Sequence, residues 1–269
     1  DYQESTHYLE SNYLYVDEVR TGASMFYFAK GDNVKSAAED FSHQVSQSFE
    51  KKRKKNKKLA IDKIMLDGFK SLESRDFKIE NGEKIMEHAR SIKSAEEIKA
   101  MRCSISACET SIHVMEKETK PGMTENDIWS ILHSENIKRG GEWIETRLLS
   151  SGTKTNPWFQ ECGSRILQNN EIVAFDTDLV GCYSMCTDIS RTWWIGDQEP
   201  TKEMKQDYQI ALEHIQKNAE LVAPGVHFKD LTFKGHQLDA MYKKQQYSGR
   251  FHGVGLCDEF PLIAYPEDY

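Results

Sequence analysis

Three aspartates that lie close together in the sequence have the clearest potential for chemistry. Asp176, Asp178 and Asp188 belong to the run IVAFDTDLVGCYSMCTDISRTWWIG, residues 172–196. Side chains two apart on a strand share a face, so Asp176 and Asp178 point the same way, and Asp188 follows on a returning strand. Three carboxylates that converge in an apolar setting repel one another unless a positive charge neutralises them.

The segment supplies little positive charge of its own, because it has no lysine and its one arginine, Arg191, follows Asp188 by three residues. A divalent cation, or a pair of cations, is the simplest source. The imidazole candidate is His252 in FHGVGLCDEF, where Gly253 and Gly255 let the backbone pass close to a metal cluster or substrate. Carboxylate and imidazole ligands suit Mn, Fe, Co or Zn. The predicted metal ligands are Asp176, Asp178, Asp188 and His252.

Helices should frame this segment. Ser94 and Glu97 have the spacing of a capping box, which predicts a helix start. Behind them, six residues recur at steps of three and four and define one face that we expect to be core: Ile98, Met101, Ile105, Cys108, Ile112 and Met115. A second helix is expected from Thr124, with Asp127 in its first turn, to Gly140-Gly141.

The same order returns later in the chain. A helix expected over 202–221 leads into Ala223-Pro224-Gly225, as the earlier one leads into Lys120-Pro121-Gly122, and a further helical segment starts near Lys229. Two such halves, each with helix, Pro-Gly turn, helix and strands, would build a curved sheet with helices outside. Turn chemistry alone can also produce two matching Pro-Gly pairs.

The amino-terminal part has a different character. Apolar runs at 25–29 and 59–66 alternate with helical stretches near 35–50 and 68–75, which suggests a small α/β unit. We predict domains at 1–88 and 89–269. The basic block from Lys51 to Lys58 is interpreted as a solvated connector; the alternative is a contact with RNA or an anionic membrane, although no aromatic residues interleave it.

Composition narrows the function classes. The net charge of -8 argues against a general nucleic-acid surface, and no apolar stretch approaches the roughly 20 residues of a membrane helix. The chain begins at Asp1 without a visible secretory signal. Six scattered cysteines without a CxxC pair indicate reduced structural thiols and a cytoplasmic protein, although Cys182 and Cys186 could in principle ligate a soft metal.

HGVG at 252–255, together with an aspartate strand and DISRT on the next one, resembles the pita-bread superfamily of creatinase, proline aminopeptidases and methionine aminopeptidase. There, two Asp, one His and two Glu bind two metals. The resemblance assigns Asp178, Asp188 and His252 to the first three and places the Glu pair beyond Tyr269, because Glu259 is too close to His252. We expect an α+β pita-bread catalytic domain with a smaller partial α/β amino-terminal domain, in a chain truncated at both ends.

The departures from the peptidase pattern are equally specific. The first strand reads Asp176-Thr177-Asp178, the segment after HGVG reads CDEFP where peptidases show a His, and TNPWFQECGSR replaces a substrate-binding His. These features, with RGGEWIETRLLSSG, IKAMRCSISACET and LAIDKIMLDG, resemble the branch of dimethylsulfoniopropionate (DMSP) lyases known as DddP.

This resemblance implies a metal-dependent carbon-sulfur lyase that cleaves DMSP to dimethyl sulfide and acrylate as a homodimer with two divalent ions, iron first among them. The metal would stabilise negative charge beside the substrate carboxylate. Asp258 is the predicted base, since it takes the place of the peptidase His and its neighbours can desolvate it. Tyr247 is a second catalytic candidate. Trp158 and Phe159 are predicted to receive the sulfonium on their aromatic faces.

Two other classes of function stay open. One is an Xaa-Pro-type metallopeptidase or another C-N hydrolase on the same fold, which the absence of the peptidase histidines disfavours. The other is a non-catalytic binding module descended from these enzymes. In each case Asp258 can instead cap or pair locally, and Tyr247 can be a surface tyrosine.

Overall fold

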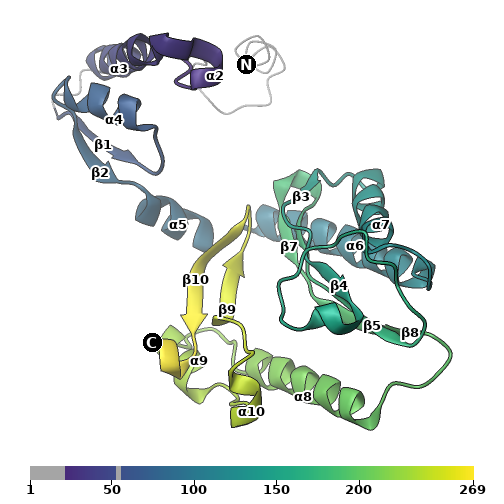
Figure 1. Cartoon of the computed structure of the whole chain (residues 1–269). Helices are drawn as coiled ribbons and strands as arrows, with labels where there is room; N and C mark the ends of the chain where they lie inside the picture. The colour runs from purple at the N-terminus through teal and green to yellow at the C-terminus, as the bar shows by residue number, and fades with distance from the viewer. Residues whose placement is uncertain (1–21, 53–55) are drawn as a thin grey trace. The chain divides into compact units, whose positions relative to one another are not determined.

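The structure is a computed structural model that describes residues 22–52 and 56–269 (Figure 1). Residues 1–21 of the predicted amino-terminal domain, and Arg53, Lys54 and Lys55 of the basic block, lie outside the described residues. The chain divides into two compact units, Asp1–Met86 and Glu87–Tyr269. The domains predicted from the sequence were 1–88 and 89–269. Within the described residues, no helix is both long enough and apolar enough to cross a membrane.

The first unit contains helices and a pair of parallel strands. Its elements are α2 (Tyr27–Lys30), η1 (Gly31–Asn33), α3 (Val34–Lys51), β1 (Lys58–Ile61), α4 (Leu66–Glu73) and β2 (Lys78–Asn81). β1 and β2 pair in parallel, and α5 (Glu83–Ser91) continues into the second unit. Two helices near 35–50 and 68–75 are confirmed.

The apolar run at 25–29 is not a strand of the expected α/β unit, because part of it forms the short helix α2. Its backbone bonds locally: the amides of Ala29 and Lys30 donate to the carbonyl of Phe26. Phe26 and Phe28 are exposed, so the run is not a buried strand of a sheet. A short apolar run does not by its periodicity distinguish helix from strand. The strand expected at 59–66 covers only 58–61, and α4 begins at Leu66.

The second unit contains antiparallel strands with helices beside them. Its first half has α6 (Ala95–Glu118), α7 (Glu125–Lys138), β3 (Trp143–Ile144), β4 (Leu149–Ser151), η2 (Gly152–Thr155), β5 (Glu171–Phe175), β6 (Asp178–Val180), η3 (Cys182–Ser184), β7 (Cys186–Asp188) and β8 (Arg191–Ile195). Its second half has α8 (Lys202–Ala219), α9 (Phe228–Lys234), α10 (Ala240–Lys243), β9 (Gly249–Val254), β10 (Asp258–Ala264) and η4 (Pro266–Asp268). The strand orders are β3-β6-β7, β4-β5-β8 and β10-β9.

Short sequence motifs correctly predicted where helices of this unit begin and end. Ser94 with Glu97, and Thr124 with Asp127, both form complete capping boxes at the starts of α6 and α7. Both Pro-Gly turns follow a long helix, and their glycines have φ of +93° at Gly122 and +85° at Gly225, a conformation that favours glycine. The expected order of helix, turn, helix and strands is present in each half.

The predicted core face of α6 is only half correct. Cys108, Ile112 and Met115 are buried, whereas Ile98 and Ile105 are 41% and 38% exposed. In the first half of the helix the small residue Ser104 is buried, and the residues that flank η3 approach it closely. Ser104 Oγ donates to the carbonyl of Met185 at 2.7 Å, and a Cβ at Gly181 would meet Ser104 at 1.8 Å.

The core lies between these helices and the strands that carry the aspartates. Its buried members are Cys108, Ile112, Met115, Ile128, Trp129, Leu132, Ile144, Leu149, Cys162, Leu167, Val173, Phe175, Leu179 and Ile195. All six cysteines are free thiols. Phe175 precedes Asp176 at the end of β5, and Leu179 follows Asp178 on β6. The packing that stabilises the unit therefore also holds those carboxyl groups in place.

Candidate metal centre and active site

Asp176 and Asp178 stand where one strand passes into the next. β5 ends at Phe175 and β6 begins at Asp178, so Thr177 lies between them. Thr177 is fully buried, and its hydroxyl donates to the carbonyl of Thr187 at 3.0 Å. Because alternate side chains point to opposite faces, the burial of Thr177 turns both aspartates to the other face, where they line a pocket.

Asp188 faces this pair from the neighbouring strand. β6 and β7 are antiparallel, and Asp178 is the register partner of Asp188. Ser190, two residues further on, donates its hydroxyl to Asp176 Oδ1 at 2.7 Å. The expected antiparallel pair around a loop is therefore present, and it brings three carboxyl groups to one end of the sheet.

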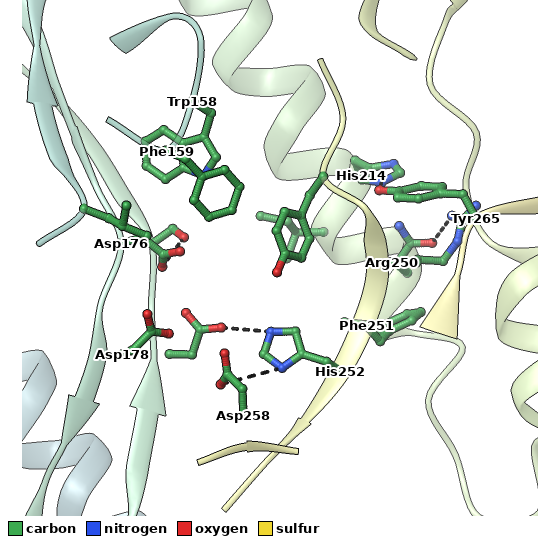
Figure 2. Close-up of a pocket in the computed structure, with 17 residues that line it drawn as sticks. Trp158, Phe159, Asp176, Asp178, His214, Arg250, Phe251, His252, Asp258 and Tyr265 are labelled. Atoms are coloured by element: carbon green, nitrogen blue, oxygen red, sulfur yellow. Dashed lines mark hydrogen bonds and ion pairs between the residues drawn. The ribbon is translucent and has the colours of Figure 1, made fainter. Parts of the chain in front are cut away.

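His252 and Asp258 come from the β9–β10 hairpin. Asp258 pairs with Val254 in the register, and the amide of Cys186 donates to the carbonyl of Gly255 at 2.7 Å, which joins the hairpin to β7. His252 Nε2 lies 2.9 Å from Asp188 Oδ2, and its Nδ1 lies 3.8 Å from Asp258 Oδ1 (Figure 2). The hairpin thus closes the cluster from the side opposite the first two aspartates.

The charges of this cluster are strongly coupled. Burial and the neighbouring charge of Asp188 raise the pKa of Asp176 to about 7, and burial raises the pKa of Asp178. Burial opposes ionisation of Asp188 as well, but hydrogen bonds with His252 and Asp176 and the charge of His252 together outweigh that effect and lower its pKa. The hydrogen bond with Asp188 raises the pKa of His252 to about 9 against the effect of burial. Protonated His252 therefore balances part of the negative charge.

The residues fit a divalent metal ion. Asp188, His252 and Asp258 each offer one ligand atom, and these three atoms lie within 4.8 Å of one another. Oxygen ligands with one imidazole suit several first-row divalent metals. A bound cation would take over the charge balance from protonated His252, which must lose its proton to ligate. Asp176 and Asp178 line the same pocket and complete the carboxylate-rich end.

All eight site residues predicted from the sequence line this one cavity of about 590 Å³, namely Trp158, Phe159, Asp176, Asp178, Asp188, Tyr247, His252 and Asp258. Phe159 is the aromatic centre of its wall, with ring centroids 6.1 Å from Trp158 and 5.5 Å from Tyr247. The pocket therefore combines a carboxylate-rich end that fits a cation with an aromatic wall.

Asp258 and Tyr247 have different electrostatic characters. Burial raises the pKa of Asp258 to about 6, although the charge of His252 acts in the opposite direction. Burial, and then the charge of Asp258, raises the pKa of Tyr247. At neutral pH Asp258 is thus ionised and can accept a proton, whereas Tyr247 keeps its proton and can donate a hydrogen bond.

Sequence reasoning did not single out five polar residues that line the pocket, namely Ser190, His214, Asn218, Arg250 and Tyr265. Ser190 stood within the recognised DISRT motif, and Arg250 lies two residues before His252 on β9, a spacing that places both on one face of a strand. His214 and Tyr265 gave no such signal, because they are distant in sequence from every recognised motif. In Figure 2 His214, Arg250 and Tyr265 lie opposite Asp176 and Asp178.

Comparison with known proteins identifies the class. The sequence profile of metallopeptidase family M24 matches residues 99–268. The chain is similar in fold to an X-Pro aminopeptidase from Thermotoga maritima, with a TM-score of 0.75 and 21% identity over 99% of this chain and 72% of that one. A Xaa-Pro dipeptidase from Bacillus anthracis gives a TM-score of 0.69 and 18% identity over 88% and 70% of the two chains. The chain belongs to metallopeptidase family M24 and has its pita-bread fold.

Within this family the chain is similar to lyases. It is 52% identical to dimethylsulfoniopropionate lyase DddP from Roseobacter denitrificans and also to that from Roseovarius nubinhibens. Each match covers 99% of this chain and 61% of the relative. The chain therefore spans about three fifths of the length of these curated relatives. A Staphylococcus aureus protein called an uncharacterized peptidase is 29% identical over 62% of this chain and 48% of its own length.

Proposed function

We propose that this protein is a metal-dependent DMSP lyase that releases dimethyl sulfide and acrylate. The observation that carries the proposal is the position of Asp258, a carboxyl group with a pKa of about 6, in one pocket with Asp176, Asp178, Asp188, His252 and an aromatic wall. In this proposal those four residues hold the metal, and Asp258 acts as the base and not as a ligand. The 52% identity to two DddP lyases over nearly the whole chain supports the same reaction.

The reaction needs a base beside the substrate's α-carbon. Asp258 takes the proton from the carbon next to the substrate carboxylate, the C-H electron pair forms the new double bond, and the C-S bond breaks to release dimethyl sulfide. A base with a pKa near the working pH combines ionisation with proton affinity. Asp258 satisfies that condition because burial raises its pKa.

The other residues bind and orient. Trp158, Phe159 and Tyr247 offer aromatic faces to the dimethylsulfonio group, a cation without hydrogen-bond donors. Tyr247 also donates a hydrogen bond to the substrate. Divalent cations at the carboxylate cluster, two in number and iron by preference over Mn, Co or Zn, would supply Lewis-acid stabilisation of the developing negative charge. We further propose a cytoplasmic homodimer.

The test is a dimethyl sulfide assay on the iron-loaded protein with Asp258→Asn beside it. The substitution keeps the shape of the side chain and removes the base, so we expect the rate to fall by about 10²–10⁴-fold. Asp62→Asn, at an exposed position in the first unit, is the matched control and should keep the full rate. Release of proline from Xaa-Pro dipeptides without release of dimethyl sulfide would show that the protein is a peptidase and not a lyase. A fully active Asp258→Asn variant would show that Asp258 is not the base.

A further inference from the structure

The pocket has a second polar end whose charge is opposite to that of the aspartate cluster. It is formed by His214 and Asn218 on α8, Arg250 on β9 and Tyr265 after β10. In Figure 2 the labelled members of this group lie across the pocket from Asp176 and Asp178. Neither the metal cluster nor the proposed base uses these residues.

Arg250 is held rigidly at this end. It is only 9% exposed, and its Nη1 donates to Asn218 Oδ1 at 3.0 Å and to the carbonyl of His236 at 2.5 Å. Its Cζ lies 4.6 Å from the centroid of the Tyr265 ring. A Cβ at Gly235 would meet three guanidinium atoms at 2.4 to 2.7 Å, so only glycine leaves room for the arginine.

The opposite edge of this guanidinium has no acceptor. Nε and Nη2 are closed to solvent and make no hydrogen bond. These two nitrogens form one of the edges with which arginine binds a carboxylate at two points. A buried donor without a partner is unfavourable, and more so when it carries charge. The edge therefore has the chemistry of a carboxylate receptor.

The charge of Arg250 is also unbalanced. Within residues 22–52 and 56–269, no carboxylate forms an ion pair with it. Glu267 is the acid whose charge acts on Arg250, but it is exposed and pairs with Lys243. Burial, followed by the charge of Arg250, lowers the pKa of His214 to about 4, so His214 is neutral at physiological pH and adds no charge. Arg250 thus carries the net positive charge at this end of the pocket.

We propose that Arg250 is an anion subsite that binds the carboxylate of a small monocarboxylic acid through its Nε–Nη2 edge. The inference deepens the proposed function, because DMSP and acrylate both carry such a group, but it concerns binding and needs no turnover. Arg250 lines the pocket, but both nitrogens are closed to solvent, so a carboxylate reaches them only after surrounding side chains move. The subsite and the metal cluster are then two separate receptors for a carboxylate.

The test is calorimetric titration of the metal-free, chelator-treated protein with propionate, which isolates Arg250 from any carboxylate binding by a cation. We expect propionate to bind and propionamide, which has no charge, to bind at least about tenfold more weakly. Arg250→Met should weaken propionate binding by about tenfold or more. Arg250→Lys should give an intermediate affinity, because lysine keeps the charge but lacks the two-point edge. Arg191→Met, at an exposed arginine near the pocket, is the matched control and should bind as the parent does.

Two outcomes would overturn the subsite. Equal propionate affinity in the parent and in folded Arg250→Met shows that Arg250 is structural, and propionate binding that requires added metal assigns the carboxylate to the cations. Circular dichroism shows whether Arg250→Met folds, and Arg250→Lys decides the question if it does not. A protein that binds propionate through Arg250 yet releases no dimethyl sulfide would refute the lyase and leave the subsite in place.

Discussion

At the residue scale, the carboxyl groups of the pocket differ because their hydrogen-bond partners differ. Asp188 is bonded to His252, which keeps it ionised, whereas Asp176 is bonded to the hydroxyl of Ser190. A hydroxyl donor orients a carboxylate but supplies no net charge, so the pKa of Asp176 stays near 7 and a bound cation would favour its ionised form. Groups that orient a metal ligand influence metal affinity without touching the metal.

Ser190→Ala tests this dependence. The variant loses the 2.7 Å hydrogen bond to Asp176 Oδ1, so we expect metal affinity to fall by about 10–100-fold while the fold is kept. Ser190→Thr retains a hydroxyl and should recover most of the affinity. The measurement is competition for Mn²⁺ or Fe²⁺ against a chelator of known affinity. Unchanged affinity in Ser190→Ala would show that Ser190 does not position a metal ligand.

At the element scale, the β9–β10 hairpin is anchored by charges on the face away from the pocket. Asp258 faces the pocket, whereas the next residue, Glu259, is buried and pairs with Lys93, which precedes α6. Arg90 Nε lies 3.6 Å from Glu259 Oε2, and the amide of Phe260 donates to Glu87 at 2.8 Å. The strand that carries the proposed base is therefore fastened to the segment around α5.

Lys93→Met should destabilise the protein by about 3–5 kcal/mol, because it leaves the carboxylate of Glu259 buried without its closest partner. The double variant Lys93→Met with Glu259→Gln removes both charges and should recover part of that loss. Lys99→Met breaks an exposed pair with Glu96 and should cost at most about 1 kcal/mol. Urea unfolding monitored by circular dichroism measures all three. A loss in Lys93→Met no larger than that in Lys99→Met would show that Arg90 alone neutralises Glu259.

At the scale of the whole molecule, the metal site couples stability to pH. His252 has an ordinary pKa of 6.5 and a folded-state pKa of about 9. Its stabilising contribution is complete below 6.5 and is lost as the pH rises through 9. The pKa of Asp176 rises from 3.8 to about 7 on folding. Its ionisation therefore opposes folding increasingly between pH 3.8 and 7, and fully above pH 7. Both groups lower the stability as the pH rises, Asp176 up to about 7 and His252 from 6.5 through 9.

We therefore expect the melting temperature of the metal-free protein to fall as the pH is raised from 6.5 toward 9. Asp176→Asn removes one unfavourable charge and should melt higher than the parent in this range. Added divalent metal should raise the melting temperature of the parent, because it binds the folded state. Differential scanning fluorimetry with and without a chelator records these effects. A metal-free protein that is more stable at pH 9 than at 6.5 would contradict this balance.

The parts of the structure that follow from local interactions were predictable. Two capping boxes, the Pro-Gly turns and the antiparallel aspartate strands each depend on residues a few positions apart. The failures have two causes: a short apolar run such as 25–29 does not distinguish helix from strand, and on α6 the packing neighbours are distant in sequence. The exposed Ile98 and Ile105 were assigned to the core by periodicity, whereas the buried Ser104 bonds to the carbonyl of Met185, which is distant in sequence.

The sequence by itself indicated the kind of chemistry, because the spacing of the aspartates and the His-Gly-x-Gly run are typical of the metal-dependent M24 family. Tertiary structure decided how each group behaves. It brought His252 within 2.9 Å of Asp188, buried Glu259 against Lys93 and left one edge of Arg250 without an acceptor. Charge balance and desolvation depend on every atom within a few ångströms, and those neighbours come from distant parts of the chain.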